Sequence, residues 1–246
     1  MTYKAAIFDL DGTLADTLAS IAHSANMALE QLGFPALPLD NYRYYAGDGA
    51  QELMKRALAA CGDTACSRLE EIMPVYAAIF EKECMYQVHP YDGIPEVLEA
   101  LKQQGLKIAV LSNKPDARTH DVIRDLFGTE LFDYVQGQTE KIRRKPCPDG
   151  ALEIARVFDV KPEECLYCGD TNTDMQTAVA AGMFPIGVLW GFRDRQELLD
   201  NGAKVLAEVP ADILKQLRET AVGMICKIAR AVRINGKYQA IMRRFR

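Results

Sequence analysis

Apolar residues follow two different periods along this chain. After a short apolar run at residues 5–8, apolar positions up to about residue 82 recur every three or four residues, as in amphipathic helices. From residue 94 onward, short apolar runs alternate with helical stretches of about ten residues. Alternation of this kind is typical of parallel β-α-β units, so the pattern predicts an α/β protein.

The elements can be placed from the apolar runs and the residues that interrupt them. The predicted strands cover residues 5–8, 106–111, 132–135, 165–168, 184–189 and, at one edge, 204–206. The predicted helices cover residues 16–32, 51–60, 67–82, 95–104, 116–126, 148–158, 173–181 and 193–200. Glycines at positions 33, 62, 105 and 182 follow four of these helices and are expected to end them.

A long helical block separates the first strand from the others. A parallel crossover needs only a dozen or more residues, and the helix at residues 95–104 already supplies one. We therefore expect a doubly wound parallel sheet from residues 1–14 and 89–217, with residues 15–88 inserted as a helical cap. Small-molecule sites often lie between two such parts, which makes this junction the first place to look for a site.

Composition narrows the class of protein. A chain of 246 residues with 49% hydrophobic and 26% charged residues is ordinary for a globular protein. No uninterrupted apolar stretch of about 18 residues exists, so no membrane span is expected. The first strand follows the N-terminus without a signal-peptide pattern, and seven cysteines form no small disulfide framework. These features favour a reduced, cytoplasmic protein, and they leave monomer and homodimer equally open.

Charge is distributed unevenly along the sequence. Residues 220–246 hold seven Lys/Arg and no Asp/Glu, whereas the preceding residues hold all 34 acidic side chains. An acidic body argues against nucleic acid as a ligand. The basic extension, residues 218–246, could form an amphipathic helix on a membrane surface or an acidic partner, or an Asn-Gly hairpin. We favour the simpler interpretation, in which it packs on the acidic body or frays.

Two acids follow the first predicted strand. Asp9 and Asp11 are two residues apart, so in an extended chain both side chains lean to the same face. Carboxylates this close repel each other unless a positive charge lies beside them. Gly12 permits a sharp turn directly afterwards. Because Mg²⁺ prefers oxygen ligands, we expect a magnesium site at this strand end.

Polar residues also follow the other central strands. Ser112 and Asn113 come after the strand at 106–111, and Asp170 and Asp174 come after the strand at 165–168. Lys145 lies in a proline-flanked loop before a helix. Ligands of open α/β sheets bind beyond the carboxyl ends of the strands, so these groups should meet there. For Asp174, metal contact and a plain helix N-terminal position both remain open.

These segments resemble four motifs of the haloacid dehalogenase superfamily of phosphatases, in the family's order. The matching segments are Asp9-Leu-Asp11-Gly-Thr13, Ser112-Asn113, Lys145-Pro146 and Gly169-Asp170-Thr171-Asn172-Thr173-Asp174. The resemblance covers residues 3–217 and implies a phosphatase fold with an inserted cap. It does not account for the basic extension.

The resemblance also implies roles for individual residues. Asp9 would be the nucleophile that forms an aspartyl-phosphate, and Asp11 would carry protons to and from the reacting oxygens. Mg²⁺ would be held by the Asp9 carboxylate, the main-chain carbonyl of Asp11 and Asp170. The residues expected to bind substrate are Thr13, Arg43, Ser112, Asn113 and Lys145.

The cap segments narrow the resemblance further. Residues 16–26, Tyr42-Arg43, Gly47-Asp48-Gly49 and Trp190-Gly191-Phe192 are similar to phosphoglycolate phosphatases. In physical terms, a cation at Arg43 beside a flexible turn could meet the carboxylate of a small acid. We therefore expect a small phosphorylated metabolite as ligand, with phosphoglycolate first.

Three alternatives to a phosphoglycolate phosphatase remain open. The same chemistry could serve another small phosphate ester, or a phosphosugar mutase reaction. The chain could instead be a regulatory or binding protein with a residual site, although none of the four motifs is impaired. Cys165 and Cys168 are spaced like a zinc or redox pair, but no second pair accompanies them, so we expect them to pack in the core.

Overall fold

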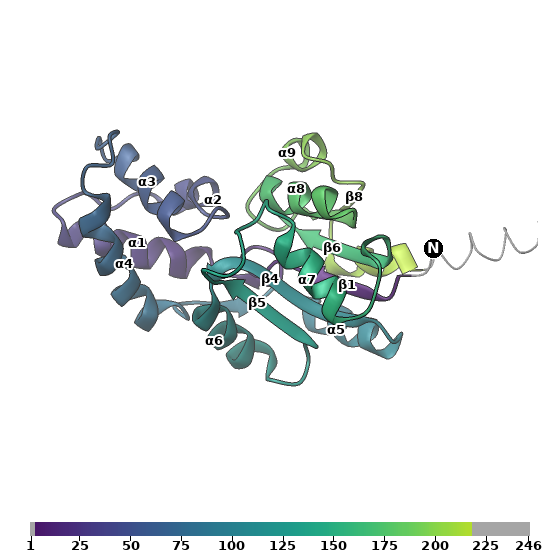
Figure 1. Ribbon diagram of the computed structural model, residues 1–246. Coiled ribbons are helices and arrows are strands. Elements are labelled where there is room, and N and C mark those ends of the chain that lie inside the picture. The colour runs from purple at the N-terminus through teal and green to yellow at the C-terminus, as the bar shows by residue number, and fades with distance from the viewer. Residues whose placement is uncertain (1–2, 218–246) are drawn as a thin grey trace, which may run out of the picture.

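The computed structural model of this protein describes residues 3–217 and contains a parallel sheet of six strands (Figure 1). The spatial order is β5-β4-β1-β6-β7-β8. The strands are β1 (Ala5–Phe8), β4 (Lys107–Pro115), β5 (Tyr134–Gln138), β6 (Cys165–Gly169), β7 (Phe184–Val188) and β8 (Val205–Ala207). Every pairing in this sheet is parallel, as expected for β-α-β units.

Helices cover both faces of the sheet, and β1 is therefore buried on both sides. Ala6 and Phe8 face a cluster that includes α5 (Ile94–Gln103) and α6 (Asp116–Phe127). Ala5 and Ile7 face a cluster that includes α7 (Asp149–Val157) and α8 (Asn172–Ala181). A strand buried on two faces must be apolar throughout, which explains its continuous apolar sequence. The predicted doubly wound fold is confirmed.

A second apolar cluster lies in the helices between β1 and β4. These helices are α1 (Leu18–Gln31), α2 (Tyr42–Tyr45), α3 (Ala50–Ala60) and α4 (Leu69–Glu83). Figure 1 shows them gathered at one side of the sheet. Their buried side chains pack together with Phe192, which reaches them from the loop after β7. The limits of the cap at residues 15 and 88 stay a prediction, supported by this separate cluster.

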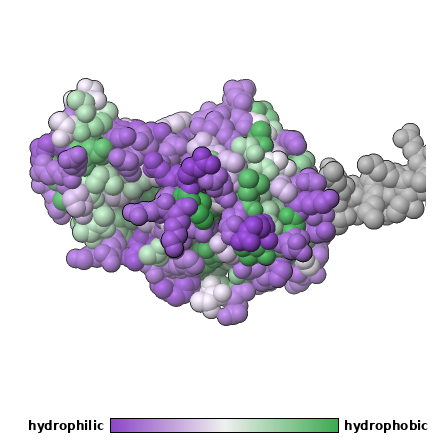
Figure 2. Space-filling model, in the orientation of Figure 1, coloured by the Kyte–Doolittle hydropathy of each residue, from purple (hydrophilic) through white to green (hydrophobic). Residues whose placement is uncertain are grey.

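The chain passes between the sheet and the helical block through a small antiparallel pair. Strand β2 (Ala15–Asp16) pairs with β3 (His89–Pro90), so the outgoing and returning segments lie side by side. Sequence patterning missed both strands, because two-residue strands carry no period. On the face shown in Figure 2, hydrophilic side chains cover most of the surface, in keeping with burial of the apolar clusters.

Several elements differ from their predicted limits. Strand β4 continues to Pro115 and therefore includes Ser112 and Asn113, which were expected after its end. Strand β5 begins two residues later than predicted, and the short helix α2 was not expected. Helix α9 (Arg195–Asp200) and short 3-10 turns at Leu39–Asn41, Pro162–Glu164 and Pro210–Leu214 complete the described elements. Among residues 3–217, no helix is long and apolar enough to cross a membrane. The helix or hairpin considered for residues 220–246 lies outside the described residues.

Truncating a side chain of the sheet core should destabilise the fold. Leu98 on α5 is fully buried, so Leu98→Ala should lower the free energy of unfolding by about 2–5 kcal/mol. Leu152→Ala, on the half-exposed side of α7, is the matched control and should change it by less than about 0.5 kcal/mol. Urea unfolding followed by circular dichroism measures both, and equal losses would contradict this description of the core.

Candidate active site

The motif at residues 9–13 begins where β1 ends. The Asp9 N–H donates to the Cys168 carbonyl at 2.9 Å, which extends the β1–β6 pairing by one residue. Gly12 then turns the chain with φ +86°, a conformation that favours glycine. A Cβ at Gly12 would lie 2.2 Å from the Asp170 carboxylate, so a side chain there would displace that acid. Backbone geometry thus brings the first and last motifs into contact.

Three buried carboxylates meet at this edge of the sheet. Oxygen atoms of Asp9, Asp170 and Asp174 lie within 4.8 Å of one another. The two later acids come from the β6–α8 loop and the first turn of α8. Thr13 Oγ1 and the Phe192 N–H hold Asp170 in place by donating to its oxygens at 2.9 and 2.7 Å. Thr13 therefore contacts an acid of this group and does not line the cavity described below, although the motif suggested contact with substrate.

Lys145 is the cation of this group. Its Nζ lies 2.8 Å from Asp9 Oδ1 and 2.7 Å from Asp174 Oδ1, and its side chain is buried. Asn113 fixes the lysine backbone: its Oδ1 accepts from the Lys145 N–H at 2.9 Å, and its Nδ2 donates to the Lys145 carbonyl at 3.1 Å. Asn113 therefore orients the loop that carries Lys145.

The pKa values reflect an excess of buried negative charge. Burial, with a further contribution from Asp174, raises the pKa of Asp170 to about 7. Burial and Asp174 also raise the pKa of Asp9 well above its usual range, against the opposing effect of Lys145. Burial alone would lower the pKa of Lys145, but Asp174 and Asp9 outweigh it and raise the value. A divalent cation suits this set of hard oxygen donors, because it would supply the missing positive charge.

Not all of the three acids are equally available to such a cation. Asp174 Oδ1 accepts from Lys145, and its Oδ2 accepts from the Thr171 hydroxyl at 2.7 Å and the Thr171 N–H at 3.1 Å. Asp174 therefore accepts three hydrogen bonds, one of them from the Lys145 ammonium, whereas Asp170 accepts one uncharged hydrogen bond at each oxygen. This arrangement favours a supporting position for Asp174 behind the other two acids.

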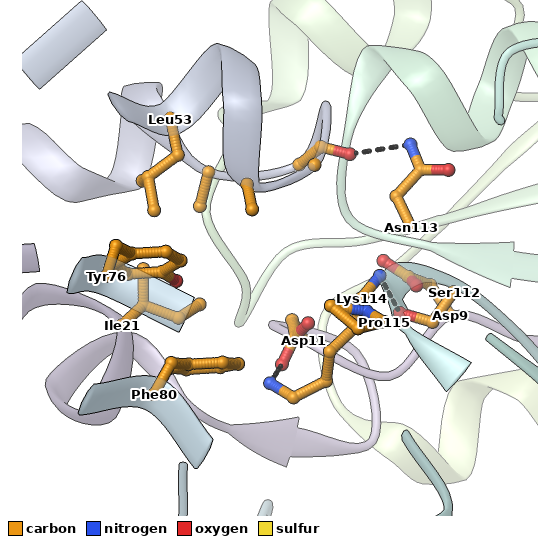
Figure 3. Close-up of a pocket in the computed structure, with 14 residues that line it drawn as sticks. Asp9, Asp11, Ile21, Leu53, Tyr76, Phe80, Ser112, Asn113, Lys114 and Pro115 are labelled. Atoms are coloured by element: carbon orange, nitrogen blue, oxygen red, sulfur yellow. Dashed lines mark hydrogen bonds and ion pairs between the residues drawn. The ribbon is translucent and has the colours of Figure 1, made fainter. Parts of the chain in front are cut away.

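A cavity opens above Asp9 and Asp11 between the sheet edge and the helical block (Figure 3). Its sheet side carries Ser112 and Lys114 beside the two acids, and its cap side carries Ile21, Leu53, Tyr76 and Phe80. The space is about 470 Å³ and is partly open to solvent. This space includes solvent at the mouth of the cavity, so it is an upper bound on the volume that a ligand could occupy.

Lys114 is the site residue that sequence reasoning missed. It follows Ser112 by two positions in β4, so both side chains point to the same face of the sheet. Its Nζ lies 2.8 Å from Asp11 Oδ1 and 4.7 Å from the centre of the Phe80 ring. The predicted strand ended at Leu111, and a strand that ended there would not place Lys114 beside Ser112. A prediction that continued β4 past Leu111 would have identified Lys114.

Arg43 does not line this cavity, so its contact with substrate stays a prediction. Its Nη1 donates to the Gly191 carbonyl at 2.9 Å, its side chain is 42% exposed, and it is not among the residues that line the cavity. The buried Arg193 lies nearby and donates from Nη2 to the Ala46 carbonyl at 2.9 Å. These arginines join the cap to the loop after β7.

The turn at residues 47–49 is also held against the sheet edge. Asn113 Nδ2 donates to the Gly47 carbonyl at 3.0 Å (Figure 3), and the Thr173 hydroxyl donates to Asp48 Oδ1 at 2.6 Å. Burial would raise the pKa of Asp48, but bonds from Thr173 and Arg56 outweigh it and lower the value. The cap turn therefore closes one side of the cavity.

Comparison with known proteins shows the family to which this chain belongs. The profile of the family described as "Haloacid dehalogenase-like hydrolase" matches residues 6–188. The chain belongs to this family. Its predicted membership is therefore confirmed, and the matched span contains all four motifs.

Curated relatives and solved structures agree with this assignment. The chain is 34% identical over 199 residues to a phosphoglycolate phosphatase of Nitrosospira multiformis, covering 80% of this chain and 88% of the relative. It is 32% identical over 186 residues to a phosphoglycolate phosphatase of Aquifex aeolicus, covering 76% and 84%. The crystal structure of a candidate phosphoglycolate phosphatase from Lactobacillus delbrueckii superimposes with a TM-score of 0.83 at 31% identity, covering 88% and 99%. The predicted class of enzyme, a phosphatase, is supported by all three.

Cation binding should depend on pH through Asp170. A carboxyl must lose its proton before it binds a metal ion, and the pKa of Asp170 is raised to about 7. In the metal-free protein, the stability contributed by this proton is full below the unfolded pKa near 4 and is lost as pH rises through 7. Mg²⁺ should therefore increase the Tm more at pH 8 than at pH 5.5.

Thermal unfolding with and without Mg²⁺ at the two pH values measures this difference. Asp170→Asn should abolish the Mg²⁺-dependent increase, whereas Asp149→Asn, on the surface of α7, should keep it. An equal increase at both pH values would show that Asp170 does not control cation binding.

Proposed function

We propose that this protein is a Mg²⁺-dependent phosphomonoesterase that acts through an aspartyl-phosphate at Asp9, with 2-phosphoglycolate as the leading substrate. The observation that carries the proposal is the position of Asp9. Its carboxylate is paired with buried Lys145 and faces a cavity for a small molecule. Around it stand the groups that a phosphoryl transfer needs, namely a second acid, a hydroxyl and a further pair of buried carboxylates.

In the first step, an oxygen of Asp9 attacks phosphorus and the bond from phosphorus to the ester oxygen breaks. Asp11 is suited to protonate the departing alkoxide, because its side chain lines the cavity and one of its oxygens is free of Lys114. In the second step, water attacks phosphorus, Asp11 takes its proton, and the Asp9 carboxylate is regenerated as phosphate leaves. The ester is thus split into an alcohol and phosphate.

The phosphoryl oxygens would be held by Ser112 and Lys145. Ser112 Oγ accepts from the Lys114 N–H at 3.2 Å, so its own O–H can donate into the cavity. The Lys145 ammonium would offset charge on the same oxygens. Mg²⁺, when bound, would be held by Asp9, Asp170 and the Asp11 carbonyl and would neutralise further phosphoryl charge.

Three points support 2-phosphoglycolate among small phosphate esters. Relatives that share about a third of their residues with this chain are named phosphoglycolate phosphatases. The cavity between the sheet edge and the cap is of limited size, which favours a small ligand. It is also lined by Lys114, which pairs with Asp11, the acid proposed to protonate the leaving alcohol. Intact, assembled motifs argue against a non-catalytic binding protein.

Replacing the nucleophile should abolish activity without unfolding the protein. Wild type should release phosphate from 2-phosphoglycolate only with Mg²⁺, and Asp9→Asn should be slower by about a thousandfold or more. Asp149→Asn is the matched control and should retain wild-type turnover. Phosphate release and circular dichroism test this directly, and an active Asp9→Asn variant would refute the proposed mechanism.

A panel of phosphate esters tests the proposed substrate separately from the mechanism. The highest kcat/KM is expected for 2-phosphoglycolate, compared with sugar phosphates and a generic aryl phosphate. A higher value for a hexose phosphate would replace the substrate while leaving the chemistry at Asp9 intact. Conversion of one sugar phosphate isomer into another would indicate a mutase.

A further inference from the structure

Lys114 is a buried cation inside the cavity with few partners. Its side chain is 2% exposed, and its Nζ is 2.8 Å from Asp11 Oδ1. On the cap side, the Phe80 ring lies 4.7 Å from Nζ, within the range of a cation–π contact. Figure 3 shows Lys114 facing Asp11, with Phe80 on the cap side of the pair.

The ammonium of Lys114 has hydrogen-bonding capacity to spare. It carries three N–H donors, and a buried charge is usually both paired and fully hydrogen-bonded. Asp11 accepts from one donor and the Phe80 ring faces the ammonium without offering an oxygen. Within residues 3–217, no second oxygen acceptor is found for Nζ. An acceptor on a molecule in the cavity would complete its hydrogen bonds.

The two lysines of the site pair with different acids. Lys145 pairs with Asp9, which attacks phosphorus, whereas Lys114 pairs with Asp11, which protonates the leaving oxygen. If Asp11 protonates the leaving oxygen, Lys114 would lie close to the leaving half of the ester. The opposite wall carries Ile21, Leu53, Tyr76 and Phe80, and among the described residues that line the cavity Lys114 is the one cation.

We propose that Lys114 selects substrates whose leaving half carries an anionic group, such as a carboxylate one carbon from the ester oxygen. This inference rests on the phosphatase function proposed above and assigns the charge recognition to a residue of β4. Phe80 holds the same ammonium from α4, so recognition requires the cap and the sheet together. Arg43 has a different position, since it binds the Gly191 carbonyl outside the cavity.

The test compares two esters that differ in charge at the leaving half. 2-Phosphoglycolate carries a carboxylate, and 2-hydroxyethyl phosphate carries a neutral hydroxyl at the same distance. Lys114→Met should raise KM for 2-phosphoglycolate roughly 10- to 100-fold, as expected for one lost charge-assisted hydrogen bond, and change KM for the neutral ester less than about threefold. Any effect on kcat through Asp11 should be equal for both esters.

Two further variants distinguish recognition from a structural effect. Lys114→Arg should retain most of the preference for the carboxylated ester, because it keeps the charge. Lys114→Gln keeps N–H donors without charge, so it should lose the preference and serves as the second neutral variant if Lys114→Met does not fold. Lys107→Met, the same substitution on the exposed end of β4, is the matched control and should behave as wild type.

The possible outcomes separate this inference from the proposed function. Wild type that hydrolyses neither ester would refute the phosphatase function and this inference with it. Wild type that hydrolyses both, with proportional KM changes in Lys114→Met, would refute the role of Lys114 and leave the phosphatase function standing. Loss of preference in Arg43→Ala but not in Lys114→Met would assign recognition to Arg43 instead.

Discussion

The structure depends on the pairing of one buried ammonium with two of three buried carboxylates at the carboxyl edge of the sheet. Asp9, Asp170 and Asp174 carry more negative charge than Lys145 can offset, and the raised pKa values of Asp9 and Asp170 follow from that excess. Burial makes this excess of negative charge costly, so the site is suited to a divalent cation. The Lys145 ammonium, beside that cation, would face a phosphoryl group.

The order of the strands brings these charged groups to one place. Strand β1 lies between β4 and β6, so the ends of these three strands meet at one edge of the sheet. Glycine is needed at position 12 because the Asp170 carboxylate fills the space where a side chain would be. The helical block then supplies the apolar wall that the polar strand ends cannot provide, and its 47–49 turn is bonded to Asn113 and Thr173.

Much of this arrangement could be predicted from sequence, because it depends on local patterns. Apolar runs with regular spacing predicted the strands and the doubly wound sheet, and the convergence of strand ends predicted that Asp9 and Asp170 meet. Lys145 was placed with them by its proline-flanked loop and by the order of the motifs. Thr13, Arg43 and Lys114 could not be assigned in this way. Their positions depend on how β4 extends and how the cap docks on the sheet, and both are set by contacts between residues more than a hundred positions apart.

The covalent bond proposed between Asp9 and phosphorus can be trapped chemically. Protein mixed with 2-phosphoglycolate and Mg²⁺ would be quenched in acid, reduced with borohydride and mapped by peptide mass spectrometry. We expect homoserine at position 9, because borohydride reduces an aspartyl-phosphate to that residue, and none when substrate is omitted. Reduction at another acid, or none at position 9 while phosphate is released, would contradict this proposal.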